Sequence, residues 1–270
     1  MSTQTRYSSS PIERGEHHTI LQPLRLAGSL VLFGLPAAVF FLAFHAFRPW
    51  LESLGYDSLT SFLSALAAPA VMLFIAALIG YSGEGRPLTW QAFAERMRFP
   101  RLRWQDILWG LAIFLVGGIG IGLLSGLVVA LIQKGLMPIP GQLPSLADPQ
   151  VIVTRDVVAQ SAGGVIHGRW DIAILYLLVF FFNVVGEELW WRGYILPRQE
   201  LAFGRYTWLV HGVLWACFHV FKWWDVLPLL PMCIITAYCA QRTRSTWGGL
   251  IGHVLSNGMG MLVVLWFIAI

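Results

Sequence analysis

The stretch IAILYLLVFFFNVVGEELWWRGY, residues Ile172–Tyr194, decides the fold of this chain. Its first half is apolar without the alternation of a half-buried strand, and it leads directly into two adjacent carboxylates, Glu187 and Glu188. A segment buried in lipid must satisfy its own backbone hydrogen bonds, and a helix does so without a partner. The stretch therefore predicts a membrane helix that carries charged groups inside its apolar environment.

The composition of the whole chain agrees with a membrane protein. Hydrophobic residues make up 57% of the 270 residues and charged residues 12%, against about 45–50% and about 25% in ordinary soluble domains. Successive long apolar runs predict an all-α, polytopic transmembrane helical bundle rather than a barrel. We expect a single transmembrane domain over residues 26–270, preceded by a polar tail over residues 1–25.

Seven apolar segments serve as candidate spans when about 20 residues are allowed for each crossing. They are residues 26–47, 59–81, 107–132, 172–190, 207–221, 226–240 and 247–270. The fifth and sixth are short and close together, which favours a tight hairpin. The proline-containing loop 133–171 holds a further mildly apolar stretch, so we expect seven spans, or eight.

The positions of Lys and Arg predict the orientation of the chain. When the 18 basic residues are assigned to alternating sides, 13 fall on the side of the N-terminus and 5 on the other. Cytoplasmic loops carry the excess of Lys and Arg, so we expect a cytoplasmic N-terminus. Residues 86–103 mix arginines with aromatic residues and predict an amphipathic helix on the headgroup surface. The lipid bilayer, and not nucleic acid, is the expected partner of this basic chain.

Ionisable side chains within apolar segments are costly and must find partners, so they are candidates for function. Glu188 and Arg192 stand four residues apart on one helical face and can neutralise each other. Glu187 points about 100° away from Glu188, on the same face as Asn183. One carboxylate would suffice for one arginine, so Glu187 is the surplus acid.

Two later segments carry the other candidates, His219 in the fifth and the pair His253 and Asn257 in the last. The pair is spaced four apart and should lie side by side on one helical face. Counted from the predicted cytoplasmic ends at about 1.5 Å per residue, all of these side chains lie at comparable depth to Glu187. We therefore expect one polar cluster within the membrane.

Three motifs in this order resemble those of a known family. They are Glu-Glu-x-x-x-Arg-Gly at residues 187–193, an aromatic-x-x-x-His at 215–219 and His-x-x-x-Asn at 253–257. The family is the CPBP family, which contains CAAX prenyl endopeptidases and bacterial "Abi" and bacteriocin-processing membrane proteases. The resemblance covers roughly the last 90 residues and suggests a protease core at about 171–270. Trp215 stands where the family usually has Phe.

The resemblance implies an intramembrane endopeptidase, in a bacterial inner (cytoplasmic) membrane, that acts on a membrane-associated, lipidated or leader-bearing peptide or protein. It implies Glu187 and His219 as the pair that activates water. His253 and Asn257 would stabilise the oxyanion, with Glu188 and Arg192 supporting them. General principles agree with these roles, because a carboxylate with a histidine can take a proton from water, and imidazole and amide groups donate hydrogen bonds.

Other interpretations of the same residues remain open. Glu187, His219 and His253 could hold a zinc ion, although we expect no metal and no cofactor, because Asn is a poor zinc ligand and no His-Glu-x-x-His helix is present. The cluster could instead be a proton relay of a proton-coupled transporter. It could also be an ion network that holds helices in register in a non-catalytic membrane immunity scaffold.

Overall fold

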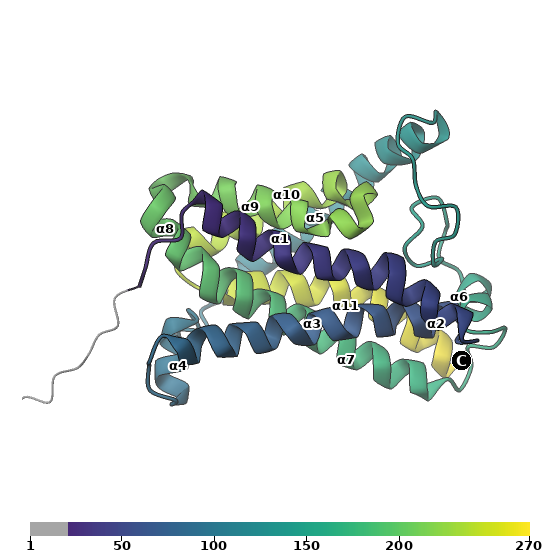
Figure 1. Cartoon of the computed structure of the whole chain (residues 1–270), viewed down its shortest axis with the longest axis horizontal. Helices are drawn as coiled ribbons and strands as arrows, with labels where there is room; N and C mark the ends of the chain where they lie inside the picture. The colour runs from purple at the N-terminus through teal and green to yellow at the C-terminus, as the bar shows by residue number, and fades with distance from the viewer. Residues whose placement is uncertain (1–20) are drawn as a thin grey trace, which may run out of the picture.

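The computed structural model describes residues 21–270, and every regular element within them is a helix (Figure 1). The all-α fold class is therefore confirmed, and each of the seven predicted segments is helical. The long helices are α1 (Leu26–Leu42), α3 (Ser58–Gly83), α5 (Trp104–Gln133), α7 (Trp170–Glu187), α9 (Thr207–Phe218), α10 (Trp223–Thr243) and α11 (Trp247–Ala269). Helix α1 is continued by η1 (Ala43–Phe47) and α2 (Arg48–Ser53), and α7 is continued by η2 (Glu188–Ile195) and α8 (Leu196–Phe203).

Within residues 21–270, five helical stretches are long and apolar enough to cross a membrane. They are Leu26–Ser53, Ser58–Gly83, Trp104–Gln133, Trp170–Thr243 and Trp247–Ala269. The fourth stretch folds back on itself, because the chain turns at η3 (Gly204–Tyr206) and again at η4 (His219–Lys222), so that α9 and α10 pack together (Figure 1). The number of crossings thus stays a prediction.

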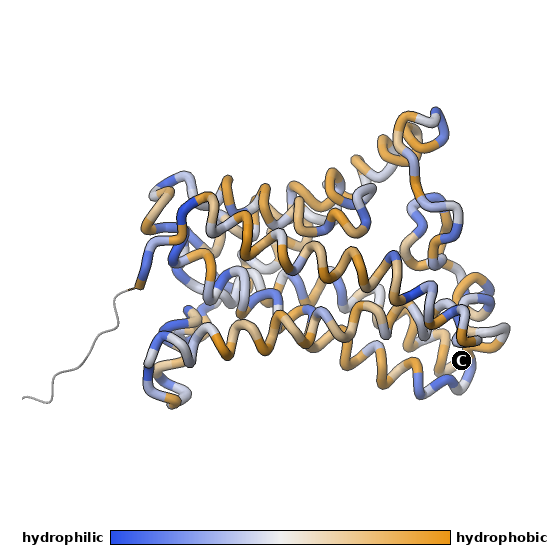
Figure 2. The backbone as a smooth tube through the Cα atoms, viewed as in Figure 1, coloured by the Kyte–Doolittle hydropathy of each residue, from blue (hydrophilic) through white to orange (hydrophobic). Residues whose placement is uncertain are grey.

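The long helices lie side by side along the longest axis of the molecule (Figure 1). One end carries α4 (Trp90–Arg96) and α8, and the other carries α2, α6 (Arg155–Ser161) and the C-terminus. Hydrophilic residues gather toward these two ends, and the length between them is mainly apolar (Figure 2). Large apolar side chains of the long helices, such as Leu123 on α5 and Ile79 on α3, are exposed, as expected for a lipid-facing surface. Most of the predicted tail, residues 1–20, lies outside the described residues.

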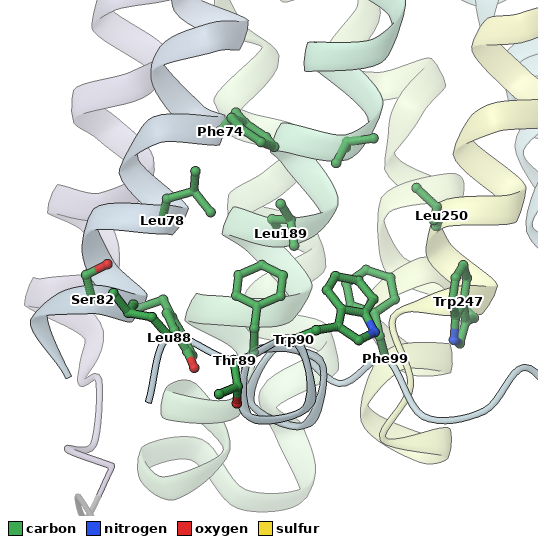
Figure 3. Close-up of a pocket in the computed structure, with 13 residues that line it drawn as sticks. Phe74, Leu78, Ser82, Leu88, Thr89, Trp90, Phe99, Leu189, Trp247 and Leu250 are labelled. Atoms are coloured by element: carbon green, nitrogen blue, oxygen red, sulfur yellow. The ribbon is translucent and has the colours of Figure 1, made fainter. Parts of the chain in front are cut away.

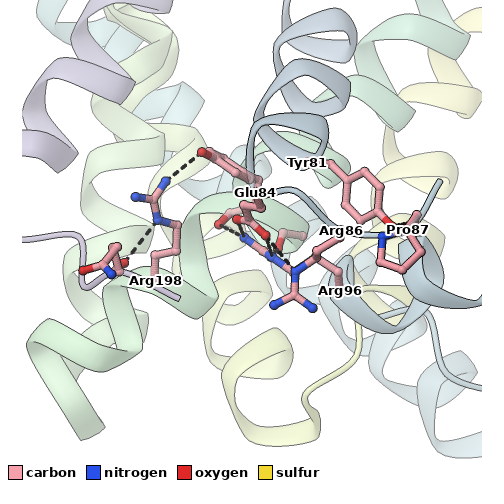
Figure 4. Close-up of polar contacts among 9 residues, drawn as sticks. Tyr81, Glu84, Arg86, Pro87, Arg96 and Arg198 are labelled. Carbon is pink, nitrogen blue, oxygen red and sulfur yellow. Dashed lines mark hydrogen bonds and ion pairs between the residues drawn. The ribbon is translucent and has the colours of Figure 1, made fainter. Parts of the chain in front are cut away.

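The connection between α3 and α5 is only in part the surface helix predicted from its arginines. It contains α4, and Arg96 at the end of α4 points inward instead of toward a headgroup surface. Its guanidinium pairs with Glu84 and donates to the carbonyls of Gly193 (2.7 Å) and Tyr194 (3.3 Å) (Figure 4). These bonds hold the connection against η2, because a buried arginine must satisfy its N–H groups. The other short helix, α6, lies in the loop between α5 and α7.

Candidate active site

The two adjacent glutamates lie where α7 passes into η2, a π-helical segment. Such segments are rare and occur frequently at functional sites. Glycines on either side let neighbouring segments approach closely. A Cβ on Gly186 would lie 3.1 Å from the carbonyl oxygen of Ala70, and one on Gly193 would lie 2.9 Å from the sulfur of Met97. The glutamates are therefore held deep inside the bundle.

Glu187 is only 2% exposed, and three N–H groups donate to its carboxylate. Asn183 Nδ2 donates to Oε1 at 2.6 Å, as the spacing on one helical face predicts. The indole Nε1 atoms of Trp191 and Trp215 donate to Oε2 at 3.2 Å and 2.8 Å. An ionised carboxylate has about four acceptor sites, so the three donors leave one acceptor site of Oε1 without a partner within residues 21–270.

Glu188 and Arg192 form the predicted ion pair, with 3.4 Å between Oε2 and Nε, and both side chains are 0% exposed. The guanidinium carbon lies 3.4 Å from the centre of the Trp215 ring, in a cation–π arrangement. Gly249 on α11 makes room for the carboxylate, because a Cβ there would come within 2.5 Å of Oε2. The pair thus sits at the packing interface between η2 and α11.

Helix α11 brings His253 and Asn257 to the same cluster. His253 Nδ1 lies 3.2 Å from Glu188 Oε1, and Asn257 Nδ2 lies 3.1 Å from His253 Nε2. Asn257 Nδ2 also donates to Asn183 Oδ1 at 2.8 Å. A carboxylate only accepts, which assigns the proton of the neutral ring to Nδ1 and leaves Nε2 as an acceptor. Asn183 therefore links α7 to α11.

His219 is not bonded directly to the other candidates. It lies at the start of η4, and its Nδ1 lies 2.9 Å from the backbone carbonyl of Trp215. The two rings are 5.9 Å apart, and the indole of Trp215 donates in turn to Glu187. Within residues 21–270, His219 thus reaches Glu187 through Trp215, without a hydrogen bond between the two side chains, and its Nε2 has no protein partner.

The three residues of the zinc alternative do not form a ligand set. Among residues 21–270, no group of three or more His, Cys, Asp or Glu side chains is arranged to hold a metal ion. Both ring nitrogens of His253 contact protein groups, Glu188 and Asn257. The metal-free site stays a prediction.

Two residues contribute more to the site than sequence reasoning recognised. Trp215 was identified only as a residue that stands where the family usually has Phe, yet its indole N–H makes a hydrogen bond to Glu187 that Phe cannot make. Asn183 was placed on the face of Glu187, and its second bond, to Asn257, joins two helices. The sequence did contain a sign of this role of Trp215. Its indole adds a hydrogen-bond donor to an apolar segment, and a buried indole N–H usually finds an acceptor.

An apolar cavity of about 660 Å³ lies against another face of η2 (Figure 3). It is lined by residues of α3, α4, the start of α11 and the α7–η2 segment, among them Leu78, Trp90, Leu250, Val185 and Leu189. The last two stand two residues before and after Glu187, so they point to the side of the helix away from its carboxylate. This cavity is therefore separate from the polar cluster.

Residues 169–259 match the family model described as type II CAAX prenyl endopeptidase Rce1-like. The matched part is 91 of the 270 residues and contains the polar cluster. It runs from the residue before α7 into the second half of α11. No curated protein and no solved structure matches the chain.

Proposed function

Because the match supports membership of the CAAX protease family, we propose that this chain is an intramembrane endopeptidase that hydrolyses a peptide bond of a membrane-associated peptide. Lipidated and leader-bearing peptides are the expected substrates. The observation that supports the proposal best is the arrangement around Glu187. Within residues 21–270, three donors fix its carboxylate and leave one acceptor site of Oε1 without a donor, and amide and imidazole groups of α11 belong to the same cluster.

Glu187 acts as the general base in the proposed reaction. A water molecule on Oε1 gives a proton to the carboxylate, and its oxygen forms a bond to the carbonyl carbon of the peptide. The proton then passes to the amide nitrogen, which leaves as an amine when the C–N bond breaks. His219 assists from Nε2, which can accept a hydrogen bond from the same water.

His253 and Asn257 stabilise the negative oxygen that develops on the carbonyl. In the resting structure the Asn257 amide contacts Asn183 and His253, so the substrate carbonyl must replace one of these contacts. His253 Nε2 can donate only when it carries a proton, and the contact of Nδ1 with Glu188 fixes the orientation of the ring. Glu188 and Arg192 therefore support the reaction by holding His253 in place.

Reconstitution of the purified chain in proteoliposomes tests the proposed function. A mixture of membrane-tethered peptides is added, new peptide N-termini are identified by mass spectrometry, and pH-driven flux is recorded in the same vesicles. An endopeptidase produces new termini and no flux. Flux without new termini would indicate the transporter, and neither signal would indicate the scaffold, so both results overturn the proposal.

Metal dependence is tested in the same assay. We expect the rate of peptide cleavage to survive exhaustive dialysis against a chelator, because the described side chains provide no three-ligand set. The metal content of the dialysed protein is measured in parallel. A rate that is lost on dialysis and restored by zinc would show the metal-free mechanism to be wrong.

Trp215→Phe measures the contribution of the indole N–H to the site. The substitution keeps an aromatic ring beneath Arg192 and removes one donor to Glu187. A hydrogen bond to a charged group contributes about 1.5–3 kcal/mol, so we expect kcat for cleavage to fall about 10- to 100-fold. Trp266→Phe, at a 62% exposed position of α11, is the control. Equal rates for the two variants would contradict the role of Trp215.

A further inference from the structure

A second cavity, of about 370 Å³, is lined by residues from the start of α9 and the end of α10. These helix ends lie at the end of the bundle that carries α8 (Figure 1). The cavity lining contains three arginines, two aromatic residues and one amide, and no acidic residue. These residues are Arg205, Trp208, Tyr238, Gln241, Arg242 and Arg244. The lining of the cavity is therefore positively charged, because it contains three arginines and no acidic residue.

The arginines of this cavity differ from others near the same end of the molecule. Arg96, Arg98 and Arg103 each pair with a carboxylate. Arg242 and Arg244 are exposed and have neither a hydrogen bond nor an ion pair from their side chains within residues 21–270. Arg205 donates to the hydroxyl of its neighbour Tyr206, and that bond leaves its charge unneutralised. The cavity therefore presents positive charge that the described chain does not balance.

The side-chain amide of Gln241 holds together the helix ends that line the cavity. Gln241 accepts from the backbone N–H of Trp208 at 2.8 Å and donates to the carbonyl of Gly204 at 2.8 Å. These bonds tie the start of α9 to the end of α10. Arg244 follows α10 with φ 51° and ψ 38°, a left-handed conformation that glycine usually provides after a helix. The arginine there places a guanidinium at the cavity despite the small backbone strain.

The aromatic residues indicate where this cavity lies relative to a bilayer. Trp208 and Tyr238 pack edge to face with their ring centres 5.7 Å apart, and Tyr238 is 40% exposed. Trp and Tyr concentrate at the boundary between lipid and water, where their apolar and polar parts are both accommodated. The cavity thus combines arginines with an aromatic wall of the kind that occurs at the boundary between lipid and water.

We propose that this cavity binds a phosphate-bearing anion, with the headgroup of an anionic phospholipid as its source in the membrane. Guanidinium groups match phosphate oxygens through paired N–H donors, and basic pockets between membrane helices bind anionic headgroups. Arg242 and Arg244 bind the phosphate, Arg205 adds a third positive charge, and the lipid chains lie along Trp208 and Tyr238. The site shares no residue with the polar cluster, so it is independent of the proposed peptidase function.

Lipid binding to the purified full-length chain in detergent micelles tests this proposal. Phosphatidylglycerol and phosphatidylcholine are titrated separately and bound lipid is counted by native mass spectrometry. Arg242→Gln/Arg244→Gln is compared with Arg25→Gln/Arg101→Gln, which removes two exposed arginines outside the cavity. At about 1 kcal/mol per arginine, we expect the affinity for phosphatidylglycerol to fall about 30-fold in the cavity variant. The control should bind it as the native chain does.

A parallel titration with inorganic phosphate identifies the source of the anion. If inorganic phosphate binds to the native chain and not to the cavity variant, that result supports the site and identifies its ligand as a soluble phosphate. Equal binding of phosphatidylglycerol by the cavity variant and the native chain would overturn the proposal, as would an equal loss in the control. Melting curves establish that both variants are folded, and Arg205→Gln provides a milder second variant in which a smaller loss is expected.

Discussion

Glu187→Gln is expected to lower the rate of peptide cleavage by about 10²- to 10⁴-fold, the contribution typical of a general base. The substitution preserves the shape of the side chain and removes its ability to take a proton from water. A glutamine oxygen can still accept from the indole N–H groups that now donate to Oε2, and only the bond from Asn183 Nδ2 to Oε1 is lost, because an amide nitrogen replaces that oxygen. The loss should therefore appear in kcat, with little change in melting temperature.

The rate is measured with a membrane-tethered peptide in proteoliposomes containing equal amounts of native and variant protein. Glu95→Gln is the matched control, because it removes the same charge from an exposed position on α4. We expect the control to cleave at the native rate. Cleavage by Glu187→Gln at that rate would end the case for Glu187 as the base.

Arg192→Met is expected to destabilise the protein by about 3–5 kcal/mol, because removing one partner of a buried ion pair leaves an uncompensated charge. Both side chains of the pair with Glu188 are fully buried. Neither Arg192 nor Oε2 of Glu188 has a hydrogen-bond partner within residues 21–270 that could compensate. The variant should therefore lose more stability than any substitution of an exposed arginine.

A double-mutant cycle distinguishes the ion pair from simple packing. Glu188→Gln/Arg192→Met removes both charges, so we expect it to be more stable than Arg192→Met alone. Thermal unfolding in detergent is followed for the native chain, the two single variants and the double variant, with Arg101→Met as an exposed control. If the stability lost by the double variant equals the sum of the losses of the two single variants, the two residues are not a coupled pair.

Spacing along single helices correctly predicted several contacts of the site. Asn183 bonds Glu187, and Asn257 contacts His253, each over four residues of one helix. The periodicity of a helix fixes which side chains share a face, so such pairs follow from the sequence alone. The roles of these residues in catalysis stay predictions, as does the number of membrane crossings.

Contacts between helices were harder to predict. His219 and Glu187 were expected to activate water together, which stays a prediction, and the structure adds a link between them through the indole and the backbone carbonyl of Trp215. Arg96 was expected on a headgroup surface, and it turns inward to the carbonyls at the end of η2. Both outcomes depend on how neighbouring segments pack, and spacing within one segment contains no information about that.

The sequence by itself determined that this chain is an apolar, all-helical protein, and it determined which polar residues share a helical face. Burial in lipid requires helices, and 3.6 residues per turn sets the faces. Only the tertiary structure decided that Asn183 would bridge to Asn257 and that Trp215 would donate to Glu187. Such contacts depend on close approach of helices, which Gly186 and Gly249 permit because they lack a side chain at the interface.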